Sequence, residues 1–253
     1  MDQFIAIIPA RYASTRFPGK PLASLAGKPM IQWVYERTAE VITETVVATD
    51  DKRIENAVNA FGGNVIMTGE HHKSGTDRCA EALLKYQELT GKQYTVVINV
   101  QGDEPFIQPS QIEKIREEFS DHECQIATLI KKIDTQEVLF DPNRPKVITD
   151  NSGYAIYFSR SVIPYVRGKN QKVWLTSNTF YQHIGMYAYR SEILLKITKL
   201  KPSALEMAES LEQLRWLENG FYIKTALTEY ESMGIDTPED LNNLINSGVF
   251  NKN

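Results

Sequence analysis

The feature that most constrains this chain is the alternation of short apolar runs with helix-like segments over its first half. Residues 4–9, 45–49, 65–67 and 94–100 are strand-like, and YTVVINV at 94–100 is the strongest strand signal in the chain. Apolar runs without polar alternation are typical of strands that are buried on both faces of a parallel sheet. Helix-like segments with short connections separate these runs, which favours parallel strands joined by right-handed crossovers. The sequence therefore predicts an α/β fold with a mostly parallel central sheet.

The segments between these runs carry helix signals of their own. Pro29 precedes apolar residues at helical spacing and is expected to open a helix. A second helix is expected to begin at Asp50 and to end at Gly62 and Gly63, because glycine commonly terminates helices. A third helix is predicted over residues 76–89.

The pattern changes from about residue 126. Extended runs at 126–133, 154–158 and 184–189 follow with few helices between them, and they are interpreted as antiparallel or mixed edge strands. Helices are predicted at 191–197, 208–219 and 238–245, with a strand at 222–227. No internal repeat or linker interrupts the chain. We therefore expect one domain over residues 1–253, in which residues 126–190 form a smaller lobe.

The bulk composition excludes several classes of protein. The formal net charge is −4, so the whole protein is a poor binder of nucleic acid, and a phosphate site must be a local basic cluster. No run approaches the roughly 18 apolar residues of a membrane span, and the early acid in MDQFIAIIPARY is unlike a signal peptide. Cys79 and Cys124 have no metal-binding spacing. These features predict a soluble cytoplasmic protein that does not bind membranes.

A basic loop follows the first strand. Arg11, Arg16 and Lys20 fall within a short segment at the strand's carboxyl end, where open α/β sheets bind ligands. A triphosphate needs converging cations and backbone N–H groups, and this loop offers both. Charged runs are often only solvated surface, so the position after the first strand carries the argument. Walker A and GxGxxG motifs are absent, which disfavours phosphate-loop ATPases and nicotinamide dehydrogenases.

Two aspartates are candidate ligands of Mg²⁺. Asp103 follows the strongest strand, after Gly102, which permits a close approach of the backbone to a ligand. Asp236 precedes Thr237, and Thr237 is the expected helix cap. Magnesium typically takes one or two carboxylates together with phosphate oxygens and waters. Either aspartate alone fits an ordinary helix start, whereas the pair favours a metal site.

Other polar clusters are weaker signals. His71 and His72 are neighbours that cannot share one helix face, so no metal site is expected there. Residues 74–78 (SGTDR) are typical of a helix cap followed by an arginine. His183 and Tyr187 share one face of an extended run. Packing or solvated surface explains each of these clusters when it is taken alone.

Taken together, the segments resemble the 3-deoxy-manno-octulosonate cytidylyltransferases (CMP-KDO synthetases) of Gram-negative bacteria. The resemblance runs nearly end to end and rests on IIPARYASTRFPGKPL, GKPMI, VVATDD, SGTDR, INVQGDEP, YFSRSVIPY, HIGMYAYR, LEQLR and GIDTPEDL. Phe17 and Asp77 depart from the family's usual leucine and glutamate without loss of charge. The resemblance implies a Rossmann-like nucleotidyltransferase fold, and a homodimer whose smaller lobe serves acceptor binding and dimerisation. It further implies transfer of CMP from CTP to the anomeric hydroxyl of 3-deoxy-D-manno-octulosonate (KDO), with release of pyrophosphate, for lipopolysaccharide biosynthesis.

The resemblance also implies roles for individual residues. The catalytic group would be Asp103, Asp236, Lys20 and Arg11, with both aspartates holding Mg²⁺. The nucleotide would contact Ala10, Arg11, Arg16, Lys20, Ser74, Thr76, Arg78 and Asp103. The sugar acid would contact Gln101, Arg160, His183, Tyr187, Glu212 and Gln213. Arg160 is the expected partner of the sugar carboxylate, because guanidinium groups bind carboxylates well.

Two alternatives stay open. Another cytidylyl- or uridylyltransferase that acts on 8-amino-KDO, a sialic-acid-like acid or a sugar phosphate would keep the same fold. A sugar phosphate would need further cations in the acceptor half, where Arg160, Arg167 and Lys169 do not form a tight cluster. A non-catalytic nucleotide sensor should have lost a metal carboxylate, whereas Asp103 and Asp236 are both present.

Overall fold

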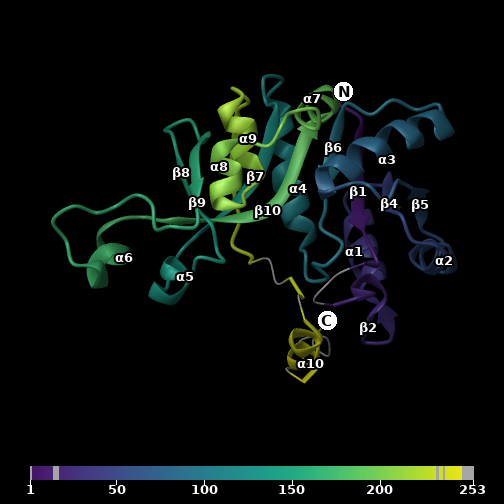
Figure 1. Ribbon diagram of the computed structural model, residues 1–253, viewed down its shortest axis with the longest axis horizontal. Coiled ribbons are helices and arrows are strands. Elements are labelled where there is room, and N and C mark those ends of the chain that lie inside the picture. The colour runs from purple at the N-terminus through teal and green to yellow at the C-terminus, as the bar shows by residue number, and fades with distance from the viewer. Residues whose placement is uncertain (1, 14–16, 232–233, 236, 247–253) are drawn as a thin grey trace. The chain divides into compact units, whose positions relative to one another are not determined.

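A computed structural model describes residues 2–13, 17–231, 234–235 and 237–246 (Figure 1). The chain divides into two compact units. The first unit contains residues 1–112 and 232–253, and the second contains residues 113–231.

The first unit is built on parallel strands. β1 (Phe4–Ala10) lies between β4 (Thr45–Thr49) and β6 (Val96–Asn99), and β5 (Asn64–Met67) pairs with the far side of β4. Every residue of β4 is buried, as are most residues of β1, because both faces of the sheet are covered. The strands predicted in this half are confirmed, although β6 is shorter at both ends than expected.

Three helices pack on these strands: α1 (Met30–Ala39), α2 (Lys52–Ala60) and α3 (Gly75–Thr90) (Figure 1). α2 begins after Asp51, whose carboxylate accepts the Arg53 N–H at 2.9 Å, and not at Asp50 as predicted. The Ser74 hydroxyl caps α3 by accepting the Asp77 N–H at 3.1 Å, and Gly91 ends α3 with a φ of 70°. Among the described helices, none combines the length and the apolar character that crossing a bilayer requires.

The first unit also contains η1 (Lys20–Leu22), β2 (Ser24–Leu25), β3 (Lys28–Pro29) and α10 (Pro238–Asn246). α4 (Pro109–Glu117) begins in this unit and ends in the second. Thr237 caps α10, as predicted: its hydroxyl accepts the Asp240 N–H at 3.1 Å, and the Asp240 carboxylate accepts the Thr237 N–H at 2.8 Å.

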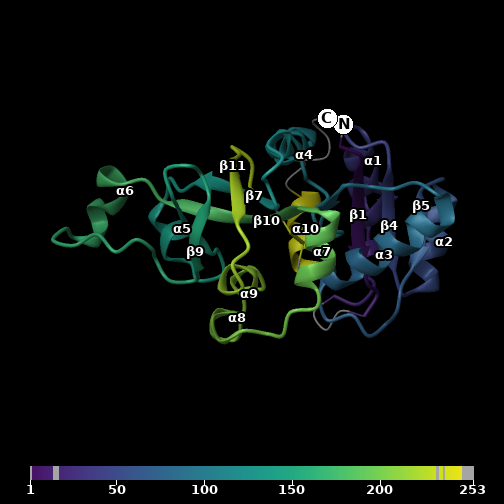
Figure 2. The same ribbon diagram turned by 90° about the horizontal axis from the view of Figure 1, so that it is seen from above.

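The second unit has a mixed sheet. β7 (Ile126–Lys132) pairs in parallel with β11 (Ile223–Leu227), which lies beside it in Figure 2, and antiparallel with β10 (Tyr181–Arg190). β8 (Lys146–Thr149) pairs antiparallel with β9 (Ala155–Ser159) and with β10. The α/β class, with a mostly parallel central sheet and an antiparallel part, is confirmed.

One prediction about the second unit is wrong, and one strand was missed. The helix expected over 208–219 is two short helices, α8 (Ala204–Glu209) and α9 (Gln213–Glu218). Ser210 stands between them with a φ of 52°, a left-handed conformation that ends a helix. β8 was missed because its first residue is a lysine, whose Nζ is held by the carbonyls of Asp141 and Arg144 at 2.8 and 2.7 Å. α7 (Ser191–Ile197) is confirmed, and the short α5 (Gln136–Phe140), α6 (Trp174–Ser177), η2 (Glu118–Ser120) and η3 (Gln171–Val173) were not predicted.

Candidate active site

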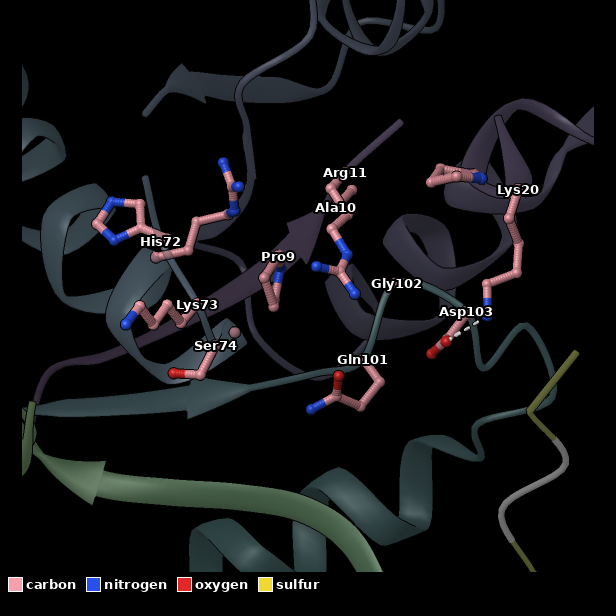
Figure 3. Close-up of a pocket in the computed structure, with 13 residues that line it drawn as sticks. Pro9, Ala10, Arg11, Lys20, His72, Lys73, Ser74, Gln101, Gly102 and Asp103 are labelled. Atoms are coloured by element: carbon pink, nitrogen blue, oxygen red, sulfur yellow. Dashed lines mark hydrogen bonds and ion pairs between the residues drawn. The ribbon is translucent and has the colours of Figure 1, made fainter. Parts of the chain in front are cut away.

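A pocket opens in the first unit where β1 and β6 end and α3 begins (Figure 3). Its lining consists of Pro9, Ala10, Arg11, Lys20, Pro21, His72, Lys73, Ser74, Gly75, Arg78, Gln101, Gly102 and Asp103. The carboxyl ends of neighbouring parallel strands meet at one edge of a sheet, which is the usual ligand-binding edge of open α/β folds. Seven residues predicted for the site therefore lie in one pocket: Ala10, Arg11, Lys20, Ser74, Arg78, Gln101 and Asp103.

Lys20 and Asp103 form an ion pair in this pocket. The Lys20 Nζ lies 2.6 Å from Asp103 Oδ2, and the two side chains are 12% and 36% exposed. Figure 3 shows this pair on one side of the pocket, His72, Lys73 and Ser74 on the other, and Arg11 between them. A predicted phosphate-binding cation and a predicted metal-binding carboxylate, which lie 83 residues apart in the chain, are thus in direct contact.

Gly102 is required by a close approach between two backbones. A Cβ at this position would lie 2.9 Å from the carbonyl oxygen of Pro9 and 3.5 Å from the Cβ of Ala10. The sequence suggested that this glycine makes room for a ligand. The structure gives a different reason for the glycine: the turn that carries Gln101 and Asp103 lies directly against the end of β1 and leaves no room for a side chain at residue 102.

Arg78 belongs to a buried polar network that shapes the pocket wall. Its side chain is 5% exposed, and its guanidinium donates to Asp50 Oδ2 at 2.6 Å and to Thr68 Oγ1 at 2.5 Å. These bonds hold the start of α3 to the residues that follow β4 and β5. Thr76, in the first turn of α3, is buried and is not part of the lining. Contacts of Arg78 and Thr76 with a nucleotide stay predictions.

His72 and Lys73 line the pocket and were missed from the sequence. Lys73 directly precedes the α3 cap, and a cation beside a helix N-terminus is the signal that could have revealed it. His72 contacts the Glu81 carboxylate, which also accepts the Gly69 N–H and pairs with Lys85. Burial alone would raise the pKa of Glu81, but these partners outweigh it and lower the pKa to about 2.

His183 and Tyr187, predicted for the sugar acid, are neighbours within the second unit. Their ring centroids are 5.3 Å apart on β10, and a bulge separates the two residues along the strand. His183 Nε2 lies 3.0 Å from Thr128 Oγ1, and burial lowers the pKa of this imidazole to about 3. Burial also raises the pKa of Tyr187 well above its usual value. Both groups are therefore uncharged at neutral pH.

Arg160 is held by backbone carbonyls of its own unit. Its guanidinium donates to Glu209 O at 2.6 Å, to Pro142 O at 3.0 Å and to Ser210 O at 3.4 Å. The Arg160 N–H also donates to the Glu209 carboxylate at 2.9 Å. This arginine fixes the end of α8, and its predicted contact with a sugar carboxylate would have to share these donors.

Glu212 and Gln213 do not form the solvated helix face that their sequence pattern would suggest on its own. Gln213 is 4% exposed, and its buried Nε2 has no hydrogen-bond partner among the described residues. Glu212 accepts a bond from Arg215 at 2.9 Å, and Arg215 also lies 3.1 Å from Glu206 of α8. Two further predicted site residues, Arg16 and Asp236, lie outside the described residues.

A cationic pocket with an aspartate, at the carboxyl end of a parallel sheet, is typical of nucleotide-binding α/β enzymes. The family model described as "Cytidylyltransferase" matches residues 5–229.

The 3-deoxy-manno-octulosonate cytidylyltransferase of Parabacteroides distasonis is 60% identical over 245 residues, which cover 95% of this chain and 96% of that protein. The protein of the same name from Cytophaga hutchinsonii is 60% identical over 240 residues, covering 94% of both chains. A solved CMP:2-keto-3-deoxy-manno-octonic acid synthetase complexed with CTP is 41% identical, with a TM-score of 0.89 over 98% of this chain and 99% of that one. This chain belongs to the 3-deoxy-manno-octulosonate cytidylyltransferase family.

Proposed function

We propose that this protein is a magnesium-dependent enzyme that transfers CMP from CTP to the anomeric hydroxyl of KDO. The products are CMP-KDO and pyrophosphate, and the activated sugar serves lipopolysaccharide biosynthesis. The observation that carries the proposal is the contact between Lys20 and Asp103 inside a cationic pocket. The chain that forms this pocket is 60% identical to a 3-deoxy-manno-octulosonate cytidylyltransferase over almost its whole length.

The triphosphate of CTP is held by the cations of the pocket. Arg11 and Lys20 come from the segment after β1, and Lys73 lies beside the start of α3. The first N–H groups of a helix of this length also attract anions. Three cations from two separate segments can each contact a different phosphate group, which fits a triphosphate better than a single phosphate.

Asp103 is a suitable ligand for Mg²⁺. Its carboxylate lines the pocket beside the phosphate-binding cations, and carboxylate oxygens are preferred ligands of Mg²⁺. Asp236 is the proposed second ligand, supported by Ile235, the preceding residue, whose N–H donates to the Asp103 carbonyl at 3.2 Å. When bound, Mg²⁺ would neutralise phosphate charge and favour deprotonation of the acceptor hydroxyl.

The chemical step is a displacement at the α-phosphorus of CTP. The anomeric oxygen of KDO forms a bond to this phosphorus and loses its proton, while the bond to the pyrophosphate oxygen breaks. Negative charge develops on the phosphate oxygens, and Arg11 and Lys20 stabilise it through fixed positive charge. Holding the acceptor in line with the leaving group supplies much of the remaining rate enhancement.

The sugar acid contacts Gln101, Arg160, His183, Tyr187, Glu212 and Gln213 in this proposal. Gln213 Nε2, which has no partner within the described part of the chain, supports it, because a buried donor needs an acceptor such as a sugar hydroxyl. His183 acts as a neutral hydrogen-bonding group and not as a general base, since a pKa of about 3 makes the imidazole a weak base. Arg160 is the proposed partner of the carboxylate.

The enzyme acts as a cytoplasmic homodimer in this proposal. Phe140, Tyr165 and Val173 support a protein–protein contact in the second unit, since these large apolar residues are 41%, 73% and 44% exposed. Sedimentation of the purified protein tests the assembly, and a monomer at working concentration would contradict it.

The test of the function is pyrophosphate release in a matrix of four nucleoside triphosphates against KDO, 8-amino-KDO and a sialic acid, with and without Mg²⁺. Release with CTP and KDO only, and only with Mg²⁺, is the expected result. Release with CTP and another sugar acid would overturn the acceptor assignment and keep the nucleotide site. No release with any pair would favour a nucleotide sensor.

A variant tests the role of the aspartate directly. Asp103→Ala should lower kcat by about 10²-fold or more, because a lost electrostatic contact to the reacting groups has an effect of this order. Asp134→Ala is the matched control, because Asp134 is an exposed loop residue of the second unit. Near-wild-type turnover of Asp103→Ala at saturating Mg²⁺ would contradict the ligand role.

A further inference from the structure

Three potential metal ligands meet beside the nucleotide pocket. His71 and His72 lie in the turn between β5 and α3, and Glu81 lies on α3. One ligand atom from each residue lies within 4.8 Å of the others. The expectation that adjacent histidines exclude a metal site assumed a helix, and it does not apply to a turn, where neighbouring side chains can converge.

The two imidazoles are close to each other and to the carboxylate. Their ring centroids are 4.4 Å apart with an interplanar angle of 38°, and His72 Nε2 contacts Glu81 Oε2. The His72 side chain is 9% exposed and Glu81 is 23% exposed. Tetrahedral Zn²⁺ with bonds of about 2.1 Å holds its ligands roughly 3.4 Å apart. The most widely spaced donors would therefore close by at most about 1.4 Å, whereas His72 Nε2 and Glu81 Oε2, which are already in contact, would move apart.

The backbone around the cluster is arranged to hold these groups. The Gly69 N–H donates to both Glu81 oxygens, at 3.2 and 3.1 Å. A Cβ at residue 69 would lie 2.5 Å from His71 Nδ1, so only glycine leaves space for the His71 ring in this position. The Gly69 N–H therefore orients the Glu81 carboxylate, as outer groups orient the ligands of metal sites, and the missing side chain leaves room for the His71 ring.

We propose that His71, His72 and Glu81 form a site for one divalent transition-metal ion, with Zn²⁺ as its best-fitting occupant. Two imidazoles and one carboxylate are a common set of zinc ligands, and a water molecule completes the tetrahedron. Mg²⁺ takes oxygen ligands almost exclusively, so this site differs in chemistry from the one proposed at Asp103. The buried thiols of Cys79 and Cys124 do not take part.

The ion would link the turn after β5 to α3. His72 and Lys73 of this turn line the nucleotide pocket, so the link fixes one wall of that pocket. Glu81 also pairs with Lys85 at 2.6 Å, and the metal shares the carboxylate with this lysine. Since Lys85 also donates to the Met67 carbonyl at 2.9 Å, the same small region joins β5, the turn and α3.

The test is Zn²⁺ binding to untagged, EDTA-treated protein, measured by competition with a chromophoric chelator and by equilibrium dialysis. The expected stoichiometry is one Zn²⁺ per chain, not displaced by millimolar Mg²⁺. Removing a residue that only hydrogen-bonds to a metal ligand typically weakens metal binding by about 10–100-fold. His71→Ala and Glu81→Gln remove a ligand itself, so each should weaken Zn²⁺ binding at least about tenfold. Co²⁺ should show d–d absorption without a thiolate charge-transfer band.

The matched control is His122→Ala, because His122 is an exposed histidine of the second unit and should leave Zn²⁺ affinity unchanged. His71 is itself exposed, so His71→Ala should fold, and circular dichroism verifies this for every variant. Absence of stoichiometric binding in the wild type would overturn the proposal. Equal affinity of wild type and His71→Ala, or weakening by His122→Ala alone, would do so as well. Cytidylyltransferase activity is not the readout, so the proposed function stands or falls separately.

Discussion

Substitution of Gly102 by alanine is the sharpest test of how the backbone positions the site. The added Cβ would lie 2.9 Å from the Pro9 carbonyl oxygen, which is roughly 0.5 Å short of ordinary van der Waals contact. The obstacle is a backbone atom of β1, so it cannot move aside as the end of a side chain can. Overpacking of this kind costs about 1–3 kcal/mol of unfolding free energy. For a chain of this length that corresponds to a loss of roughly 2–12 °C in Tm.

The effect on activity follows from the neighbours of Gly102. The clash displaces the turn that carries Gln101 and Asp103, and a misplacement of about 1 Å can cost 10²-fold in rate. A shift of roughly 0.5 Å should therefore lower kcat/KM by about tenfold. The assay is pyrophosphate release from CTP and KDO, with thermal unfolding of the same preparations.

Gly91→Ala is the matched control for lost stability. Gly91 ends α3 with a φ of 70°, a conformation that costs a non-glycine residue about 1–2 kcal/mol. This glycine lies at the opposite end of a 16-residue helix from the pocket, so Tm should fall while kcat/KM stays unchanged. Equal loss of activity in both variants would show that Gly102→Ala acts only through stability. Wild-type kcat/KM and Tm for Gly102→Ala would refute the argument from crowding.

Three further predictions concern stability, pH and the acceptor. Asp50→Ala should lower the unfolding free energy by about 3 kcal/mol in urea titrations, because it leaves the Arg78 charge buried without its carboxylate partner. The neighbouring Asp51→Ala should lower the unfolding free energy by only about 1 kcal/mol, through loss of a helix cap. His183 has a pKa of about 3 in the folded protein and about 6.5 when unfolded. Between these pH values the unfolded chain binds the extra proton, so the stability of the folded protein falls as pH falls. In urea titrations across this range His183→Gln should lose less stability as pH falls, and a slope equal to that of the wild type would contradict the buried neutral state. Arg160→Ala should raise the KM for KDO and leave that for CTP unchanged, and an equal rise of both would show that Arg160 is misplaced.

Elements set by nearby residues were predictable from the sequence. β4 matches its predicted bounds because five apolar or threonine residues in a row suit a fully buried strand. The caps of α3 and α10 were predictable because Ser74 and Thr237 satisfy backbone donors only a few residues away. Local pattern therefore determined the parallel half of the fold and the helix starts near the site.

Elements in which a buried polar side chain or a turn interrupts the apolar pattern were not predictable in this way. Lys146 begins a strand because carbonyls of Asp141 and Arg144 receive its ammonium, and no periodic pattern signals that burial. The predicted helix over 208–219 breaks at Ser210, whose left-handed backbone ends α8, where the N–H groups of Ser210 and Leu211 both donate to the Glu206 carbonyl. Periodicity describes one segment at a time, so it cannot report such contacts.

The candidate site also has a part that the sequence predicted and a part that it did not. The sequence by itself determined which residues bear charge and at which strand ends they stand, including Arg11, Lys20 and Asp103. Only the tertiary structure decided that Lys20 meets Asp103 and that the turn between β5 and α3 brings His72 and Lys73 into the pocket wall. The physical reason is that strand positions follow from local apolar pattern, whereas contacts between side chains depend on how the strands order in the sheet and how closely the turns approach one another.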